Sequence, residues 1–162
     1  MRRVFFCEKA HLQVLFGAAM VCCLDALSKA WIKSTFKIGE SLPIIPGVFQ
    51  FTRLKNTGAA FSMFYQHPAL LTLVSGTLLP LLALFMLSKK SLNRWEILGF
   101  MFVLGGAFSN LLDRIFVGGV TDFLDFVLIH FPVFNVADSF IFVGVVLLLS
   151  QYVKHHYQTT DS

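Results

Sequence analysis

The stretch from Asp138 to Lys154, DSFIFVGVVLLLSQYVK, decides the fold class, because no charged residue separates the aspartate from the lysine. An apolar run of this length predicts a helix that crosses a membrane. Asp138 lies 16 residues before Lys154, about 24 Å along a helix that rises 1.5 Å per residue. The hydrocarbon core of a bilayer is about 30 Å thick, so this carboxylate is expected just inside the far boundary. An ionisable group there costs roughly 2.5 kcal/mol or more, which makes a functional role the default hypothesis.

The composition of the whole chain is that of an integral membrane protein. Of its 162 residues, 56% are hydrophobic and 14% are charged, and the mean hydropathy is +0.73. A soluble domain of this size needs more polar surface. The net charge of +4 does not predict a nucleic-acid partner, because the basic residues cluster at the ends of apolar runs, where they orient a protein in the bilayer.

Four apolar segments have about the length of a membrane-spanning helix. They cover about residues 12–31, 68–87, 95–112 and 131–153. The predicted fold class is therefore a membrane all-α core with four transmembrane helices, in a single domain over 1–162. An even number of spans places both termini on one side of the membrane, and the basic residues of the short flanks predict that this side is the cytoplasm.

The segment between the first two spans, about residues 33–66, differs from the rest of the chain. It contains Pro43, Pro46 and Gly47, beside the β-prone run 48–52. We expect a small extracytoplasmic β-rich platform here. The second outer loop, residues 114–130, contains a pair of glycines at which the chain can turn back toward the membrane.

Two aspartates are the candidate reacting groups. Asp122 follows the glycine pair. From the sequence alone, a solvated loop carboxylate and a functional group are about equally favoured interpretations of Asp122. Asp138 or Asn135 could simply cap the fourth helix. Capping explains one of these two residues but not an acid that opens an apolar run, so function is favoured for Asp138. Two carboxylates held close together can share one proton, which predicts an intramembrane aspartyl peptidase.

Other polar residues have spacings that predict supporting roles. Asn110, Asp113 and Arg114 lie on one face at the outer end of the third span. We expect Asp113 and Arg114 to brace the reacting groups from behind. Asp25 and Lys29 are four residues apart on the first span, and this spacing predicts a structural ion pair.

The stretch from Asn56 to Ser62, NTGAAFS, combines an amide with small residues. Gly58 allows another backbone to approach closely. The stretch is either an ordinary loop or one wall of a substrate groove. No serine–histidine–aspartate order, metal-binding helix motif or phosphate-binding glycine loop is visible in the sequence. We therefore expect no metal and no cofactor.

Five motifs, in order along nearly the whole chain, resemble those of the lipoprotein signal peptidases (signal peptidase II), four-span enzymes of the bacterial cytoplasmic membrane. Ser28 replaces the threonine of the first motif, and Ser109 stands where glycine is usual in the third. The matching segments are DALSK at 25–29, NTGAAFS at 56–62, GGAFSNLLDR at 105–114, GVTDF at 119–123 and FPVFNVADS at 131–139.

The resemblance implies that Asp122 and Asp138 are the catalytic pair. It implies an inner-membrane enzyme with its active site near the outer face. Its substrate would be a prolipoprotein whose cysteine carries diacylglycerol, and membrane lipid would be its other partner. We expect a monomer. The substrate-binding or site-supporting residues would be Asn56, Gly58, Asn110, Asp113, Arg114 and Asn135.

Two functions of other classes are weighed against this prediction. A small proton-coupled carrier would use Asp25, Lys29 and Asp138 as relay groups, but it predicts ionisable residues throughout the membrane depth. A metal-dependent membrane hydrolase would use Asp113, Asp122 and Asp138 as ligands. Sensitivity to a chelator separates the metal enzyme from the peptidase.

Overall fold

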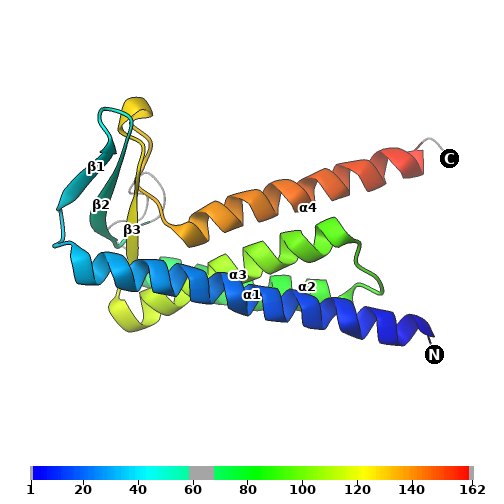
Figure 1. Cartoon of the computed structure of the whole chain (residues 1–162). Helices are drawn as coiled ribbons and strands as arrows, with labels where there is room; N and C mark the ends of the chain where they lie inside the picture. Colours follow the sequence, from blue (N-terminus) through cyan, green and yellow to red (C-terminus); the bar gives the residue numbers. More distant parts are fainter. Residues whose placement is uncertain (1, 59–67, 161–162) are drawn as a thin grey trace.

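The computed structural model describes residues 2–58 and 68–160, and it consists of a helical bundle with a small sheet at one end (Figure 1). Both chain termini lie at the end away from the sheet. The four helices are α1 (Arg2–Thr35), α2 (Pro68–Ser88), α3 (Arg94–Val117) and α4 (Val136–Thr160). The remaining elements are the strands β1 (Ser41–Ile45), β2 (Phe49–Asn56) and β3 (Val120–Asp125), and the short helix η2 (Val127–Ile129).

All four helices are long and apolar enough to cross a membrane, with mean hydropathies from 1.4 in α3 to 2.3 in α2. The predicted fold class is confirmed. The helices differ in burial, because 39% of the spanning window of α3 is buried inside the protein but only 6% of that of α2. Helix α3 is therefore the centre of the bundle, and α1, α2 and α4 all pack against it.

Two adjacent glycines allow the close packing of α3. A Cβ atom at Gly105 would lie 2.6 Å from the carbonyl oxygen of Ala18 on α1, and one at Gly106 would lie 2.6 Å from that of Ala137 on α4. No real Cβ atom approaches a backbone oxygen this closely. Small residues at such positions let helix backbones approach each other inside a membrane.

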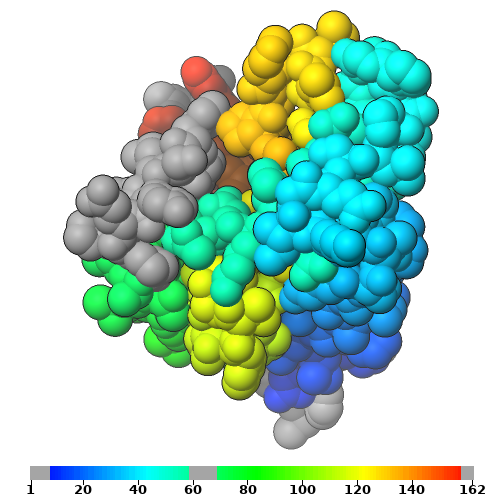
Figure 2. All heavy atoms as spheres, turned by 90° about the vertical axis from the view of Figure 1, so that its left-hand side faces the viewer, coloured from blue at the N-terminus to red at the C-terminus, as the bar shows by residue number. Residues whose placement is uncertain are grey.

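The sheet has the order β1-β2-β3, and both strand pairs are antiparallel. The β1–β2 hairpin lies within the expected platform. The third strand comes from the loop between α3 and α4, where only a loop was expected, and it places Asp122 opposite Leu54 in the ladder. Figure 2 shows this end of the molecule, with the cyan hairpin beside the yellow and orange segment that precedes α4. The α1–α2 and α3–α4 connections thus contribute strands to one sheet.

The helix boundaries differ from those expected from hydropathy. Helix α4 begins at Val136 and not near residue 131. Before it, Phe134 pairs with Leu124 of β3 in an isolated β-bridge, which keeps this segment extended. Helix α3 continues to Val117 and ends where Gly118 adopts the left-handed conformation, with φ 70°. Apolar length alone did not reveal these ends, because they depend on backbone pairing and capping.

We predict that Gly105→Ala and Gly106→Ala each lower the melting temperature of the protein in detergent. The added methyl group would press on a backbone carbonyl, and overpacking of this kind costs about 1–3 kcal/mol. That cost should outweigh the gain of about 1 kcal/mol that alanine has over glycine in a helix. Gly76→Ala on α2 is the matched control, since its nearest neighbour would be a Leu111 methyl group at 4.0 Å. Melting temperatures of the α3 variants at or above that of the control would contradict the packing argument.

Candidate active site

The two aspartates meet at a single residue, Asn135, which is fully buried. Its side-chain amide donates from Nδ2 to Asp122 Oδ1 over 2.7 Å. Its backbone N–H donates to Asp138 Oδ2 over 3.1 Å. Asp122 comes from β3 and Asp138 from the first turn of α4, so the sheet and the bundle each supply one carboxylate. Both acids therefore lie within one hydrogen bond of the same asparagine.

Asn135 and Asp138 also cap α4 reciprocally. The backbone N–H of Asp138 donates to Asn135 Oδ1 over 2.9 Å, while the Asn135 N–H donates to the Asp138 carboxylate. This is a capping box, in which each side chain satisfies the other residue's free N–H. Capping was weighed as an explanation for one of the two residues, and the structure shows it for both. It holds the Asp138 side chain in one orientation and leaves Oδ1 to another donor.

That donor is Asn110 on α3. Its Nδ2 donates to Asp138 Oδ1 over 2.8 Å, and its Oδ1 accepts from Lys29 Nζ over 2.9 Å. Asn135 Nδ2 also donates to Asn110 Oδ1, over 3.2 Å. Because ammonium can only donate, Lys29 fixes the amide with its oxygen toward the cation and its nitrogen toward Asp138.

Lys29 belongs to a buried ionic network that joins three helices. Its Nζ lies 2.6 Å from Asp25 Oδ2 and 3.0 Å from Asp113 Oδ2. The ion pair predicted between Asp25 and Lys29 is confirmed. Asp25 also accepts from Ser109 Oγ over 2.7 Å and from the Ala137 N–H, at the start of α4, over 2.8 Å. The hydroxyl of Ser109 is thus part of the network.

The contacts of Lys29 with Asn110 and Asp113 could not be read from the sequence. The spacing of four residues identified only the partner on its own helix. The other partners lie about 80 positions away on α3. A buried lysine with a single carboxylate partner would still have two unsatisfied N–H donors. That lysine therefore needs further acceptors, and this need was the signal in the sequence for partners on another helix.

Asp122 is also held from β2. Asn56 Nδ2 donates to Asp122 Oδ2 over 2.7 Å, and Asn56 Oδ1 accepts from the Gly58 N–H over 2.9 Å. The amide of Asn56 is therefore oriented by the backbone of the next turn, with its donor facing the carboxylate. Ala59 to Ser62, which complete the predicted groove wall, lie outside the described residues.

The remaining predicted residues, Asp113 and Arg114, contact residues that surround the carboxylates. Asp113 contacts Lys29 and Lys33, and its Oδ2 accepts from the Thr121 N–H over 3.3 Å. Arg114 donates from its guanidinium to the backbone oxygen of Asn110 over 3.3 Å. In the described ranges, no group of three or more His, Cys, Asp or Glu side chains is placed to hold a metal ion.

Burial raises the pKa of Asp122 from 3.8 to about 7, and the nearby charge of Asp138 acts in the same direction. The hydrogen bonds from Asn56 and Asn135 and the charge of Lys29 act in the opposite direction and are outweighed. Desolvation disfavours the ionised carboxylate, and a like charge adds to that effect. Near neutral pH the Asp122 carboxyl group is thus divided between its protonated and ionised forms.

This pKa predicts a pH-dependent stability. Asp122 binds its proton more tightly in the folded than in the unfolded protein, so its contribution to folding stability falls as the pH rises from 3.8 to about 7. Asp122→Asn cannot ionise. Its melting temperature relative to the wild type should therefore be higher at about pH 8 than at about pH 5.

Asp125→Asn is the matched control, because Asp125 lies on the same strand and accepts from Gln50 and Thr52. The same pH dependence in the control, or none in Asp122→Asn, would contradict the assignment to Asp122.

Comparisons with known proteins agree over most of the chain. Residues 17–154 match the model of a family described as signal peptidase (SPase) II. A lipoprotein signal peptidase of Nostoc sp. is 51% identical over 127 residues, which is 78% of this chain and 80% of that protein. The lipoprotein signal peptidase of Acaryochloris marina is 41% identical over 143 residues, or 84% of this chain and 86% of that protein.

Two solved structures described as bacterial membrane enzymes have the same fold. One matches with a TM-score of 0.80 at 29% sequence identity, and covers 87% of each chain. The other matches with a TM-score of 0.77, also at 29% identity, and covers 87% of this chain and 92% of that one.

Proposed function

The chain belongs to the signal peptidase II family, and from this premise we propose that Asp122 and Asp138 are the catalytic pair of an aspartyl endopeptidase. It removes the signal peptide from prolipoproteins and cleaves before the cysteine that carries diacylglycerol. The observation that carries the proposal is the position of Asn135, which hydrogen bonds to both carboxylates. Acids from two separate parts of the chain are thereby held at one place.

The proposed mechanism is general acid–base hydrolysis without a covalent intermediate. One carboxylate is ionised and takes a proton from a water molecule, whose oxygen attacks the carbonyl carbon of the scissile peptide bond. The other carboxyl group is protonated, donates a hydrogen bond to the carbonyl oxygen, and supplies the proton with which the amine leaves. A pKa of about 7 for Asp122 supports a singly protonated pair near neutral pH. The pair titrates as a unit, so neither role is assigned to one residue.

The hydrogen-bond donors around the pair suit this mechanism. Asn56 and Asn135 donate to the two oxygens of Asp122, and Asn110 and the Asn135 N–H donate to those of Asp138. These donors hold the side chains without neutralising them. The two carboxyl groups are therefore already oriented before the reaction, so the protein needs to rearrange little when the water attacks the substrate carbonyl.

The position of the site in the bundle fits a lipid-bearing substrate. Asp138 lies in the first turn of a helix with the properties of a membrane span, and Asp122 lies on the adjoining sheet. The scissile bond would lie at the membrane boundary, with the diacylglycerol chains beside the helices. We place the sheet on the outer face of the bacterial cytoplasmic membrane and both termini in the cytoplasm, with the protein acting as a monomer.

The carrier hypothesis is less well supported by the geometry. Asp25 and Lys29 contact each other and residues of α3 and α4 in a closed network near the sheet. The spanning window of α2 contains no charged residue that could continue a relay. A relay would need polar groups along the membrane depth.

We predict that Asp122→Asn and Asp138→Asn each reduce cleavage of a purified diacylglyceryl prolipoprotein at least about 100-fold in detergent. The loss follows because general acid–base catalysis contributes about 10²–10⁴-fold. Asp125→Asn should retain most of the activity, since it replaces a carboxylate of the same strand that contacts Gln50 and Thr52. Melting temperatures identify any variant that fails to fold. A folded Asp122 or Asp138 variant with near-normal activity would refute the catalytic assignment.

Treatment with excess EDTA distinguishes the proposed peptidase from a metal-dependent hydrolase. The peptidase should keep its full rate, because its proposed mechanism uses no metal ion. Asp113, one ligand of the alternative metal site, already contacts Lys29, Lys33 and the Thr121 N–H. Loss of activity with EDTA, restored by adding a divalent cation, would favour the metal enzyme.

A further inference from the structure

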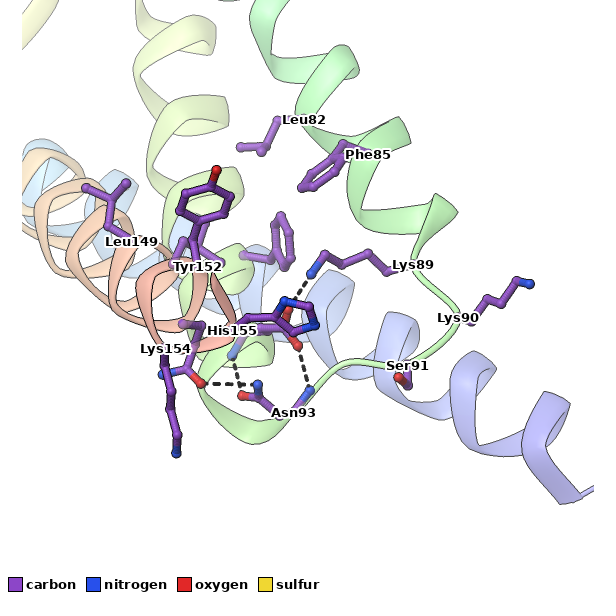
Figure 3. A pocket seen from close by; sticks show the side chains of 14 residues that line it. Leu82, Phe85, Lys89, Lys90, Ser91, Asn93, Leu149, Tyr152, Lys154 and His155 are labelled. Atoms are coloured by element: carbon purple, nitrogen blue, oxygen red, sulfur yellow. Dashed lines mark hydrogen bonds and ion pairs between the residues drawn. The ribbon is translucent and has the colours of Figure 1, made fainter. Parts of the chain in front are cut away.

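A hollow lies at the end of the bundle away from the sheet (Figure 3). It is a cavity of about 850 Å³ between α2 and α4, beside the start of α3. Both α2 and α4 pack on α3, which leaves this space between them. Small-molecule sites have volumes of about 300–1,000 Å³. The proposed peptidase reaction makes no use of this cavity.

One part of the cavity is apolar. Leu82 and Phe85 of α2 line it on one side, and Leu149 and Tyr152 of α4 line it on the other. Phe85, Leu149 and Tyr152 are exposed side chains on helices with the length and apolarity of membrane spans. These walls would face lipid chains and not water.

The other part of the cavity carries positive charge. Among the residues that the structure describes, three lysines and one acid line it: Lys89, Lys90, Lys154 and Glu96. Lys89 forms an ion pair with Glu96, so the surplus charge belongs to Lys90 and Lys154. Figure 3 shows these two side chains on opposite sides of the cavity, both pointing away from its centre.

Along both chain segments the apolar lining residues precede the charged ones. Phe85 lies in α2 and Lys89 follows directly after the end of that helix, while Tyr152 in α4 is followed two residues later by Lys154. A phospholipid makes the same transition between its acyl chains and its headgroup. Basic pockets between transmembrane helices recognise anionic headgroups in this way.

We propose that this cavity binds one anionic phospholipid, such as a phosphatidylglycerol. Its phosphate lies at the polar end of the cavity, toward which the flexible side chains of Lys90 and Lys154 would turn, and an acyl chain lies against Phe85 and Leu149. A free phosphate ion would satisfy the lysines but would leave the apolar walls unfilled, so the lipid is the occupant that matches the whole lining. The proposal concerns a site at the opposite end of the bundle from the carboxylates, and it does not depend on the peptidase mechanism.

Native mass spectrometry of the full-length protein from detergent tests the proposal. With phosphatidylglycerol and phosphatidylcholine offered in equal amounts, we expect one phosphatidylglycerol to be retained at least about tenfold more than phosphatidylcholine. Lys90→Gln with Lys154→Gln should reduce that retention about tenfold or more, because each lysine near anionic lipid contributes about fivefold. Lys9→Gln with Lys37→Gln is the control, which removes two exposed charges that do not line the cavity, and it should retain the lipid.

Leu149→Trp provides a second variant, which fills the apolar part and keeps both lysines. It should lower the retention of phosphatidylglycerol, and its melting temperature shows whether it is folded. Equal retention of both lipids by the wild type would overturn the proposal. So would a loss of phosphatidylglycerol in the control variant as large as that in the variant of Lys90 and Lys154. Displacement of the lipid by inorganic phosphate alone would also overturn it and assign the cavity to a soluble anion. A dimer that disappears in the lysine variant would overturn it in favour of a second copy of the chain.

Discussion

The carboxylate of Asp25 is the group on which the rest of the site depends. It is fully buried, and it accepts from Lys29 of its own helix, from Ser109 of α3 and from the backbone of Ala137 of α4. A buried charge is stable only when it is paired and hydrogen bonded. These three partners therefore fix how α1, α3 and α4 meet. Lys29, once paired, orients Asn110, and Asn110 in turn holds Asp138.

The number of helices and the unusual position of Asp138 could be predicted because both signals are local, whereas Asp122 was singled out only by the family resemblance. A run such as residues 138–154 needs only its own length and apolarity to indicate a span, and an acid within it stands out without knowledge of its neighbours. The partners of Lys29 on α3 could not be predicted in this way. They depend on which faces of distant helices meet, and the close approach of α3 to α1 and α4 depends on glycines such as Gly105 and Gly106.

The strand that carries Asp122 was missed for a related physical reason. Its six residues are too few to give a clear alternation, and its hydrogen-bonding partner is β2, more than 60 positions earlier. Recognition of the strand would have shown that its two acids, Asp122 and Asp125, have different surroundings. Residues three apart on a strand point to opposite faces, so Asp122 and Asp125 cannot both face the bundle. The structure agrees, since Asn56 and Asn135 hold Asp122 while Gln50 and Thr52 hold Asp125.

The joining of strands from the α1–α2 and α3–α4 connections into one sheet has a mechanical consequence. Asp122 is part of a strand hydrogen bonded to the hairpin, whereas Asp138 belongs to the rigid first turn of α4. The same strand is also tied to the start of α4, because Phe123 and Leu124 form backbone hydrogen bonds with Phe134. A load applied to the exposed strand β1 would therefore be passed through β2 and β3 to both acids.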